Sequence, residues 1–267
     1  MRVATLGFVL PALLAGLLTA CATQAPRQPA AESPPFTIER FRDERKLGEG
    51  VHTLVLDNPY GEIHVRQTSA GALAIQGAEQ RIGEVPRIAR LDWFEAEGRQ
   101  GLRVRYAEHD PETPANPRLG RVDLYAFVPP GLRLDLRTDF GAIVVRRIDD
   151  EVTARSRSGG ITVAARGAMD LETREGQVRA WTMSADWRGP VRLVGGAGVL
   201  VDVPLFAPID LQADAVDGIR ADFDVDSIVQ DANGRWQARH RIGDASLPLR
   251  IESGADILLQ GLTVRRP

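Results

Sequence analysis

The chain has 267 residues, of which 43% are hydrophobic and 26% are charged, and its formal net charge is −3. These proportions are those of a globular protein, and they exclude a chain that is disordered throughout. The weak negative charge excludes a protein that binds nucleic acid or anionic lipid through a strong overall positive charge.

Residues 1–20 predict a signal peptide. Arg2 precedes an apolar run over residues 3–18, which is too short to span a membrane. The following Leu18-Thr19-Ala20-Cys21 resembles the lipobox of bacterial lipoproteins, in which the chain is cut before the cysteine and the thiol receives a diacylglyceryl group. The resemblance implies that Cys21 is acylated, and the alternative is an ordinary signal peptide with a chance cysteine.

Acylation of Cys21 would anchor the protein to a membrane, because two or three acyl chains bind lipid far more stably than one. Ala22 after the cysteine resembles the outer-membrane sorting pattern, so we expect a lipid-anchored protein of the cell envelope, at the outer membrane if the host has two membranes. Cys21 is the single cysteine of the chain, which excludes an intrachain disulfide. Residues 21–36 are rich in Pro and Ala and predict a flexible tether.

Residues 37–131 predict an N-terminal β-sheet subdomain that includes a first coil. That coil is indicated by an isolated motif at residues 58–65, and residues 91–97 and 102–106 predict a hairpin. Residues 108–119 contain three prolines and predict a surface loop, and residues 122–128 alternate as a further strand.

Residues 132–267 contain a repeat of about 18 residues. The pattern of Thr or Ser, Gly, and two apolar residues recurs with shifts of 18 and then 17 residues, and weaker copies follow to the end of the chain. The three clear copies are Thr138, Gly141, Ile143, Val145; Ser156, Gly159, Ile161, Val163; and Thr173, Gly176, Val178, Ala180.

A unit of two short strands cannot bury its own core and must stack on its neighbours, so we predict that the rungs from residue 132 onward stack in chain order, each covering the core of the one before. We therefore predict an all-β fold, a β-solenoid whose alternating apolar residues point inward and whose Thr or Ser hydroxyls bind backbone groups at the corners. The alternative is an antiparallel sandwich of evenly spaced hairpins. Asn233 and Gly234 predict a type I′ hairpin in the less regular stretch between about 181 and 245.

Several segments carry a family resemblance: residues 122–131 (VDLYAFVPPG), 132–145 (LRLDLRTDFGAIVV), 152–163 (VTARSRSGGITV) and the closing segment 242–259, which ends in IESGADILL. They resemble the bacterial putative-adhesin β-solenoid family, whose function is unknown. The resemblance implies a membrane-tethered solenoid, and it brings no catalytic residues and no cofactor.

The residues that could carry chemistry form no recognisable catalytic or metal motif. The four histidines, at positions 52, 64, 109 and 240, lack the spacing of a zinc site, and no serine hydrolase elbow occurs. Alignment of the three clear coils predicts three outward ladders: Asp135, Thr153, Asp170; Arg137, Arg155, Glu172; and Asp139, Arg157, Arg174. Their mixed signs favour a salt-bridged wall, with an acid and base pair of Asp135 and Asp170 as the alternative.

A binding surface is the stronger functional candidate. Arg suits contact with carboxylates or phosphates, and we predict a patch formed by Arg133, Arg137, Arg155, Arg157 and Arg174. Trp181, Trp187 and Trp236 could stack on sugars or pack in the core.

We therefore expect a non-enzymatic, adhesin-like interaction or envelope-scaffold module, with envelope polysaccharide or another envelope protein as its partner. We expect neither nucleic acid nor a metal as a ligand. The alternatives are a carbohydrate-active enzyme on the same scaffold and a protein that binds lipid or lipopolysaccharide, which would need an open apolar groove.

Overall fold

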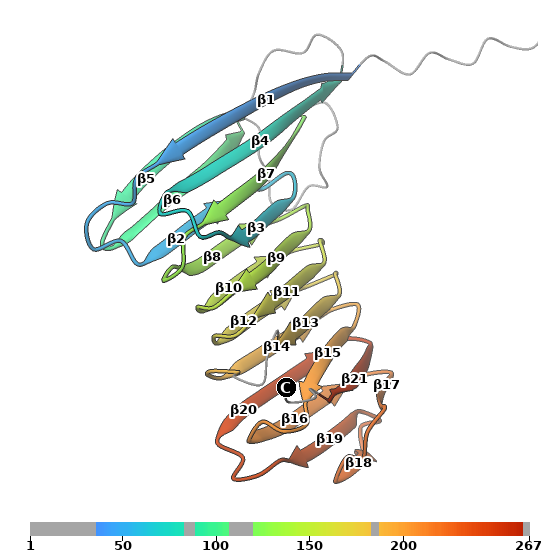
Figure 1. The fold of residues 1–267 in the computed structure, drawn as a ribbon. Coiled ribbons are helices and arrows are strands. Elements are labelled where there is room, and N and C mark those ends of the chain that lie inside the picture. The colour runs from blue at the N-terminus through green and yellow to red at the C-terminus, as the bar shows by residue number, and fades with distance from the viewer. Residues whose placement is uncertain (1–35, 83–88, 107–119, 183–186, 264–267) are drawn as a thin grey trace, which may run out of the picture. The chain divides into compact units, whose positions relative to one another are not determined.

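The computed structural model describes residues 36–82, 89–106, 120–182 and 187–263 (Figure 1). Within these ranges the chain forms 21 strands in two mixed, open sheets and no helix, which confirms the predicted all-β class. In the same ranges, no helix has the length and apolar character needed to cross a membrane. Cys21, the predicted signal peptide, nearly all of the predicted tether and the predicted loop at 108–119 lie outside the described residues.

Sheet A has ten strands and sheet B has eleven, and both belong to the compact unit Pro35–Pro267. In spatial order, sheet A contains β1 (Phe36–Arg45), β4 (Leu73–Ile82), β7 (Arg121–Val128), β3 (Ile63–Gln67), β9 (Ile143–Ile148), β11 (Ile161–Ala165), β13 (Val178–Thr182), β15 (Val199–Pro204), β21 (Asp256–Leu262) and β17 (Gly218–Ala221). Sheet B contains β18 (Ser227–Gln230), β19 (Trp236–Arg241), β16 (Ile209–Ala215), β20 (Leu247–Ser253), β14 (Val191–Gly195), β12 (Met169–Thr173), β10 (Val152–Ser156), β8 (Arg133–Thr138), β2 (Thr53–Asp57), β6 (Arg99–Tyr106) and β5 (Ala89–Ala96).

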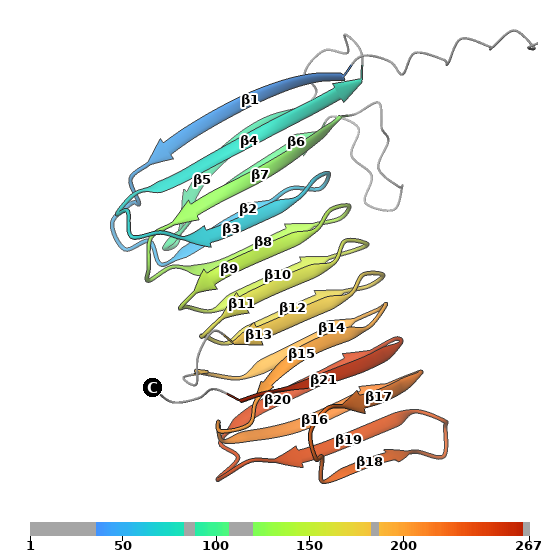
Figure 2. The ribbon, with the colours of Figure 1, turned by 45° about the vertical axis from the view of Figure 1, so that its right-hand side comes forward.

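The middle of both sheets is a stack of rungs, each made of one strand in sheet B followed by one strand in sheet A (Figure 2). Within each sheet these strands pair in parallel, whereas consecutive hairpins would pair antiparallel. The register places Val152 between Leu134 and Met169. It confirms the alignment of the three clear coils that the repeat predicts.

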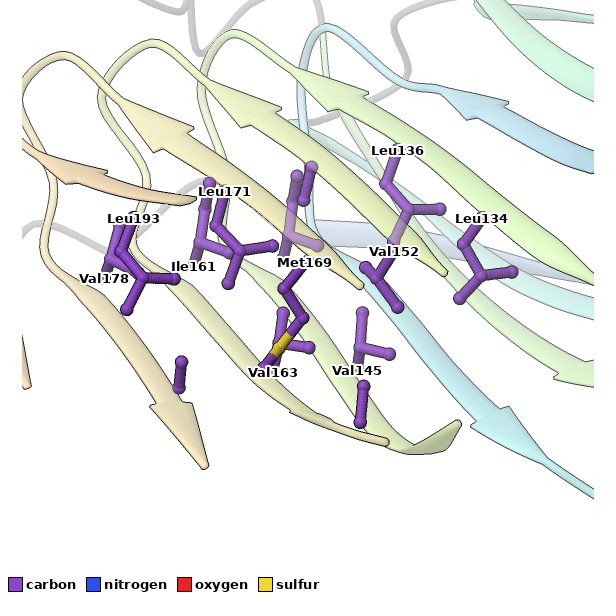
Figure 3. Packing of buried hydrophobic residues seen from close by; sticks show 14 of the residues in the cluster. Leu134, Leu136, Val145, Val152, Ile161, Val163, Met169, Leu171, Val178 and Leu193 are labelled. Atoms are coloured by element: carbon purple, nitrogen blue, oxygen red, sulfur yellow. The ribbon is translucent and has the colours of Figure 1, made fainter. Parts of the chain in front are cut away.

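Aliphatic side chains from both sheets meet between the two layers (Figure 3). Leu136, Ala154, Leu171 and Leu193 occupy neighbouring positions along sheet B, and none is exposed to solvent. Ile161 on the facing sheet is equally buried. Period-two alternation directs these residues inward, and their burial is the main source of stability.

The corners between the two sheets are bound by hydroxyls and closely packed glycines. Thr173 Oγ1 donates to the Gly159 carbonyl at 2.9 Å and accepts the Gly176 amide at 3.1 Å, which confirms the predicted role of this position. A Cβ on Gly159 would lie only 1.5 Å from the carbonyl oxygen of Gly141 on the adjacent rung. The backbones of successive corners therefore touch, and glycine is required there for space.

The last rung in the sequence is not the last rung in space. β20 lies between β14 and β16, and β21 lies between β15 and β17. The prediction that rungs from residue 132 onward stack in chain order is therefore wrong at this end. The alternation of apolar residues shows which face of a strand packs in the core, but it does not show which strand lies beside it. The pattern therefore could not distinguish stacking in chain order from the observed order.

The hairpin at the C-terminal end pairs β18 with β19, and β19 pairs antiparallel with β16. Its turn is not type I′, because Gly234 has a positive φ of 81° and Asn233 does not have a positive φ. The Asp231 carboxylate instead accepts the amides of Asn233 and Arg235, at 2.8 and 3.0 Å. These bonds favour a type I turn followed by a left-handed glycine. Trp236 is half-buried against the core at this end.

At the N-terminal end, the motif at residues 58–65 is part of the stack, because β3 pairs in parallel with β9. β6 and β7 form the next rung outward and pair in parallel with β2 and β3. Antiparallel strands then end both sheets: β5 beside β6, and β4 and β1 beside β7. The β5–β6 pair confirms the predicted hairpin, which turns through the positive-φ residues Glu97 and Gly98.

Candidate functional site

The outer face of sheet B carries the predicted charge ladders. The register aligns Asp135, Thr153 and Asp170 across β8, β10 and β12, and it aligns Arg137, Arg155 and Glu172 beside them. The strands are parallel and in register, so residues one repeat apart in the sequence become lateral neighbours about 4.8 Å apart.

Four of the five predicted arginines line one hollow of about 310 Å³ at the corner end of these strands. We call it the basic hollow, and it is lined by Arg137, Thr138, Asp139, Arg155, Ser156, Arg157, Glu172 and Arg174. Arg133 is not part of it, because it begins β8 and lies four residues before Arg137 along the strand. Arg133 is exposed, and its Nε lies 3.8 Å from a carboxylate oxygen of Glu151.

The local sequence explains why these arginines converge. Strands β8, β10 and β12 each end on an outward residue and an inward hydroxyl, and a corner residue follows, as in Arg155, Ser156 and Arg157. Ser156 Oγ accepts the Gly159 amide at 2.9 Å and fixes the corner. Thr173 Oγ1 accepts the Gly176 amide in the same way, so Arg157 and Arg174 are held at equivalent corners over the ends of β10 and β12.

The guanidinium groups differ in how far carboxylates already neutralise them. Arg137 donates from Nε to Asp135 at 3.1 Å, and Arg155 is paired with Asp170 and lies 3.7 Å from Glu172. Arg174 is exposed, and within the described ranges its guanidinium group has no hydrogen bond or ion pair. Arg174 is therefore the cation best placed to bind an added anion.

Arg157 lies at the wall of the hollow. Its Nε is 3.9 Å from Glu175, and its guanidinium carbon lies 5.8 Å from the ring centre of Phe140. The hollow thus combines the exposed guanidinium of Arg174 with that of Arg157, which other side chains already hold in place.

Asp170 does not have the properties of a catalytic acid. Burial raises its pKa, but hydrogen bonds from Arg155 and Arg192 outweigh this effect and hold the pKa below its usual value. Asp135 is two strands away and is paired with Arg99 and Arg137. Both carboxylates are committed to ion pairs, whereas a general acid at neutral pH needs a raised pKa.

Two further hollows continue from the basic hollow along the outer face of sheet B. One of about 320 Å³ shares Glu172 and Arg174 with it and extends to Glu252. Another, of about 260 Å³, shares Glu252 and reaches Arg239 on β19. Sequence reasoning missed this extension because it depends on β20 lying next to β14. The three hollows form a shallow lane that crosses successive strands.

The other candidate residues are spread over the molecule. Trp187 is buried, and Trp181 is partly exposed with Arg179 over its ring at 5.3 Å. His64 pairs with Glu62 and His240 lies 3.3 Å from Asp226, whereas His109 lies outside the described residues. Within the described ranges, no three His, Cys, Asp or Glu side chains group as metal ligands.

No family model matches the chain, and no curated protein matches its sequence. Among solved structures, it is similar to a putative cell adhesion protein from Clostridium sporogenes, with 10% identity, a TM-score of 0.49, and coverage of 85% of this chain and 100% of that one. It is also similar to a putative adhesin from Bacteroides fragilis, with 11% identity, a TM-score of 0.27, and coverage of 83% and 97%. A putative adhesin from Parabacteroides distasonis shows 6% identity, a TM-score of 0.24, and coverage of 83% and 97%. None of these three TM-scores reaches 0.5, so these likenesses carry no argument about function.

Proposed function

We propose that the protein is a lipid-anchored lipoprotein of the bacterial cell envelope, and that its rungs form a β-solenoid acting as a non-enzymatic, adhesin-like interaction or scaffold module. The observation that carries this proposal is the basic hollow on sheet B. Arg137, Arg155, Arg157 and Arg174 come from three successive rungs to line it.

The proposed ligand is an envelope polymer that carries carboxylate or phosphate groups, either a polysaccharide or the surface of another envelope protein. Guanidinium groups bind such anions through paired N–H donors. The parallel rungs repeat about every 4.8 Å, so a linear polymer lying along the shallow lane would meet a new strand at each step. A rigid wall of this kind needs no rearrangement to bind, which lowers the entropic cost.

The proposed anchor is a diacylglyceryl group on Cys21, with residues 21–36 as tether, residues 37–131 as N-terminal subdomain and residues 132–267 as solenoid. Support comes from the lipobox-like sequence and from the Pro and Ala composition after it. Cys21→Ser should abolish incorporation of radiolabelled palmitate. If the variant still takes up the label, the proposed anchor is wrong.

The binding proposal is tested with Arg174→Ser and with Arg133→Ser as a matched control, because both arginines are exposed and only Arg174 lines the hollow. Binding to immobilised dextran sulfate at low salt should weaken at least tenfold in Arg174→Ser and stay within twofold of the unmodified protein in Arg133→Ser. Equal losses in both variants would show general electrostatic attraction and would refute a specific site.

The natural partner is sought by capture from intact envelopes with the acylated protein. Arg174→Ser, which keeps its anchor, serves as the control. A polymer or protein enriched by the native chain and lost from the variant supports the proposal. If neither chain enriches any envelope component, the interaction function is refuted.

A further inference from the structure

Another hollow lies on the outer face of sheet A, over strands β1, β4 and β7. Figure 2 shows these three strands together at one end of the sheet. The hollow has a volume of about 480 Å³, and we call it the aromatic hollow. It is lined by Arg40, Phe41, Arg42, Gln76, Gly77, Ala78 and Tyr125. The aromatic hollow lies on sheet A, whereas the basic hollow lies on sheet B, and the two hollows share no residue.

The strand register explains the shape of the aromatic hollow. Arg42 is opposite Gln76 on β4, and Gln76 is opposite Tyr125 on β7. Arg40 is opposite Ala78 on β4, and the small side chain of Ala78 leaves open space above this strand. Strand β4 is therefore the floor, with guanidinium groups on one side and an aromatic ring on the other. The two walls are two strand spacings apart, about 10 Å.

Tyr125 is a large apolar side chain that is 41% exposed although its strand lies inside the sheet. The His64 ring stacks on it with 4.7 Å between ring centres and 18° between planes. His64 comes from β3, on the far side of β7 from the hollow, so the opposite ring face of Tyr125 lines the hollow.

The stacked histidine is itself fixed. His64 Nε2 lies 2.7 Å from a Glu62 carboxylate oxygen, and Arg121 pairs with the other oxygen of that carboxylate at 2.8 Å. The hydrogen bond with His64 is the largest cause of a lowered Glu62 pKa, which keeps this carboxylate charged. A fixed ring behind Tyr125 limits its side-chain freedom, and a ligand would lose less entropy in ordering it.

The opposite wall is cationic. Arg42 donates from Nε to Glu44 at 2.9 Å on the same strand. Arg40 is exposed and has no ion pair among the described residues. On β7, the carboxylate of Asp123 lies opposite Ala78, and it already accepts Arg121 Nε at 2.7 Å and the Glu62 amide at 2.9 Å.

We propose that the aromatic hollow binds one carboxylate-bearing sugar residue of an acidic glycan. The C–H face of the sugar ring packs on the open face of Tyr125, its carboxylate binds Arg40 and Arg42, and a hydroxyl bonds to the Gln76 amide. An apolar surface with a few convergent polar groups is the usual form of a small-ligand site. Together with the basic hollow, this site would give the module binding surfaces on both outer faces.

The test is calorimetric titration of the full chain with tetragalacturonate, with neutral maltotetraose as the comparison ligand. We expect at least tenfold tighter binding of the acidic tetrasaccharide. The double variant Arg40→Gln with Arg42→Gln should lose at least tenfold in affinity for it. Arg66→Gln is the matched control, because Arg66 is an exposed arginine of the same sheet that does not line the hollow, and it should stay within twofold.

Tyr125→Thr separates binding from stability. Threonine is compatible with a strand, and thermal unfolding of the variant shows whether the fold persists. A folded Tyr125→Thr that loses tenfold in affinity supports the proposal. Unchanged affinity in this variant, equal binding of the two tetrasaccharides, or no binding by the native chain would overturn it. Loss of binding in Arg174→Ser but not in the Arg40 and Arg42 variant would also overturn it and would assign the ligand to the basic hollow.

Discussion

Replacement of Gly159 by alanine tests the close packing of the rungs. The new Cβ would lie 1.5 Å from the Gly141 carbonyl oxygen, whereas ordinary contacts begin at 3.4 Å, so the backbones must separate by roughly 2 Å. That separation would break neighbouring bonds such as Ser158 N–H to the Asp139 carbonyl, at 3.0 Å. With about 1–3 kcal/mol for overpacking and about 1 kcal/mol for each of two lost hydrogen bonds, we expect a loss of about 3–5 kcal/mol.

The measurement is the free energy of unfolding from urea denaturation, followed by circular dichroism. Gly160→Ala is the matched control, because a Cβ on the adjacent residue would lie 3.4 Å from the Gln177 carbonyl oxygen, an ordinary contact. Its stability should stay within about 1 kcal/mol of the native value. If Gly159→Ala is as stable as Gly160→Ala, the corners are not in backbone contact and the reasoning is refuted.

Three other substitutions or deletions test the remaining features of the stack. Thr173→Val removes the hydroxyl that bonds to the Gly159 carbonyl and the Gly176 amide, and it should lower the free energy of unfolding in urea by about 1–3 kcal/mol. Thr162→Val, at an outward position, is the control and should change this free energy little. The pKa of Asp170 is lowered, so its ion pairs stabilise the fold above pH about 4, and this stabilisation is lost as the pH falls through the folded-state pKa. Asp170→Asn should therefore be less stable than the native protein by at most about 1 kcal/mol at pH 7, and as stable as the native protein in strong acid. A chain ending at residue 246 lacks β20 and β21 and should lose cooperative unfolding. A peptide of residues 247–267 added in trans should restore cooperative unfolding. If the shortened chain alone unfolds cooperatively, the observed strand order is contradicted.

The middle of the fold could be predicted because two independent patterns agree there. Alternating apolar residues assign each strand its inward face, and the recurring hydroxyl and glycine fix the corner that separates the two strands. Together they determine the register, so Arg137, Arg155 and Glu172 are neighbours as expected. The basic hollow follows from the same register, apart from Arg133, which starts its strand rather than ending it.

The ends of the stack could not be predicted in the same way. β16 and β20 have equivalent alternation, with Leu211 and Leu249 both buried, so neither sequence identifies which one lies against β14. The turn at Asn233 depends on the Asp231 carboxylate, which the Asn-Gly pair does not reveal. The aromatic hollow was missed because it arises from pairing between β1, β4 and β7, segments that are far apart in the sequence and share no repeat.

The position of β20 and β21 has a consequence for the timing of assembly. β16 pairs in parallel with β20, and β17 pairs in parallel with β21, and both partners are made later in the chain. β16 and the β18–β19 hairpin beside it therefore cannot reach their final places before residues 247–262 have been made. Until β20 and β21 have been made, this end of both sheets stays unfinished. The order of synthesis along the chain therefore differs from the order in which the rungs at this end can be completed.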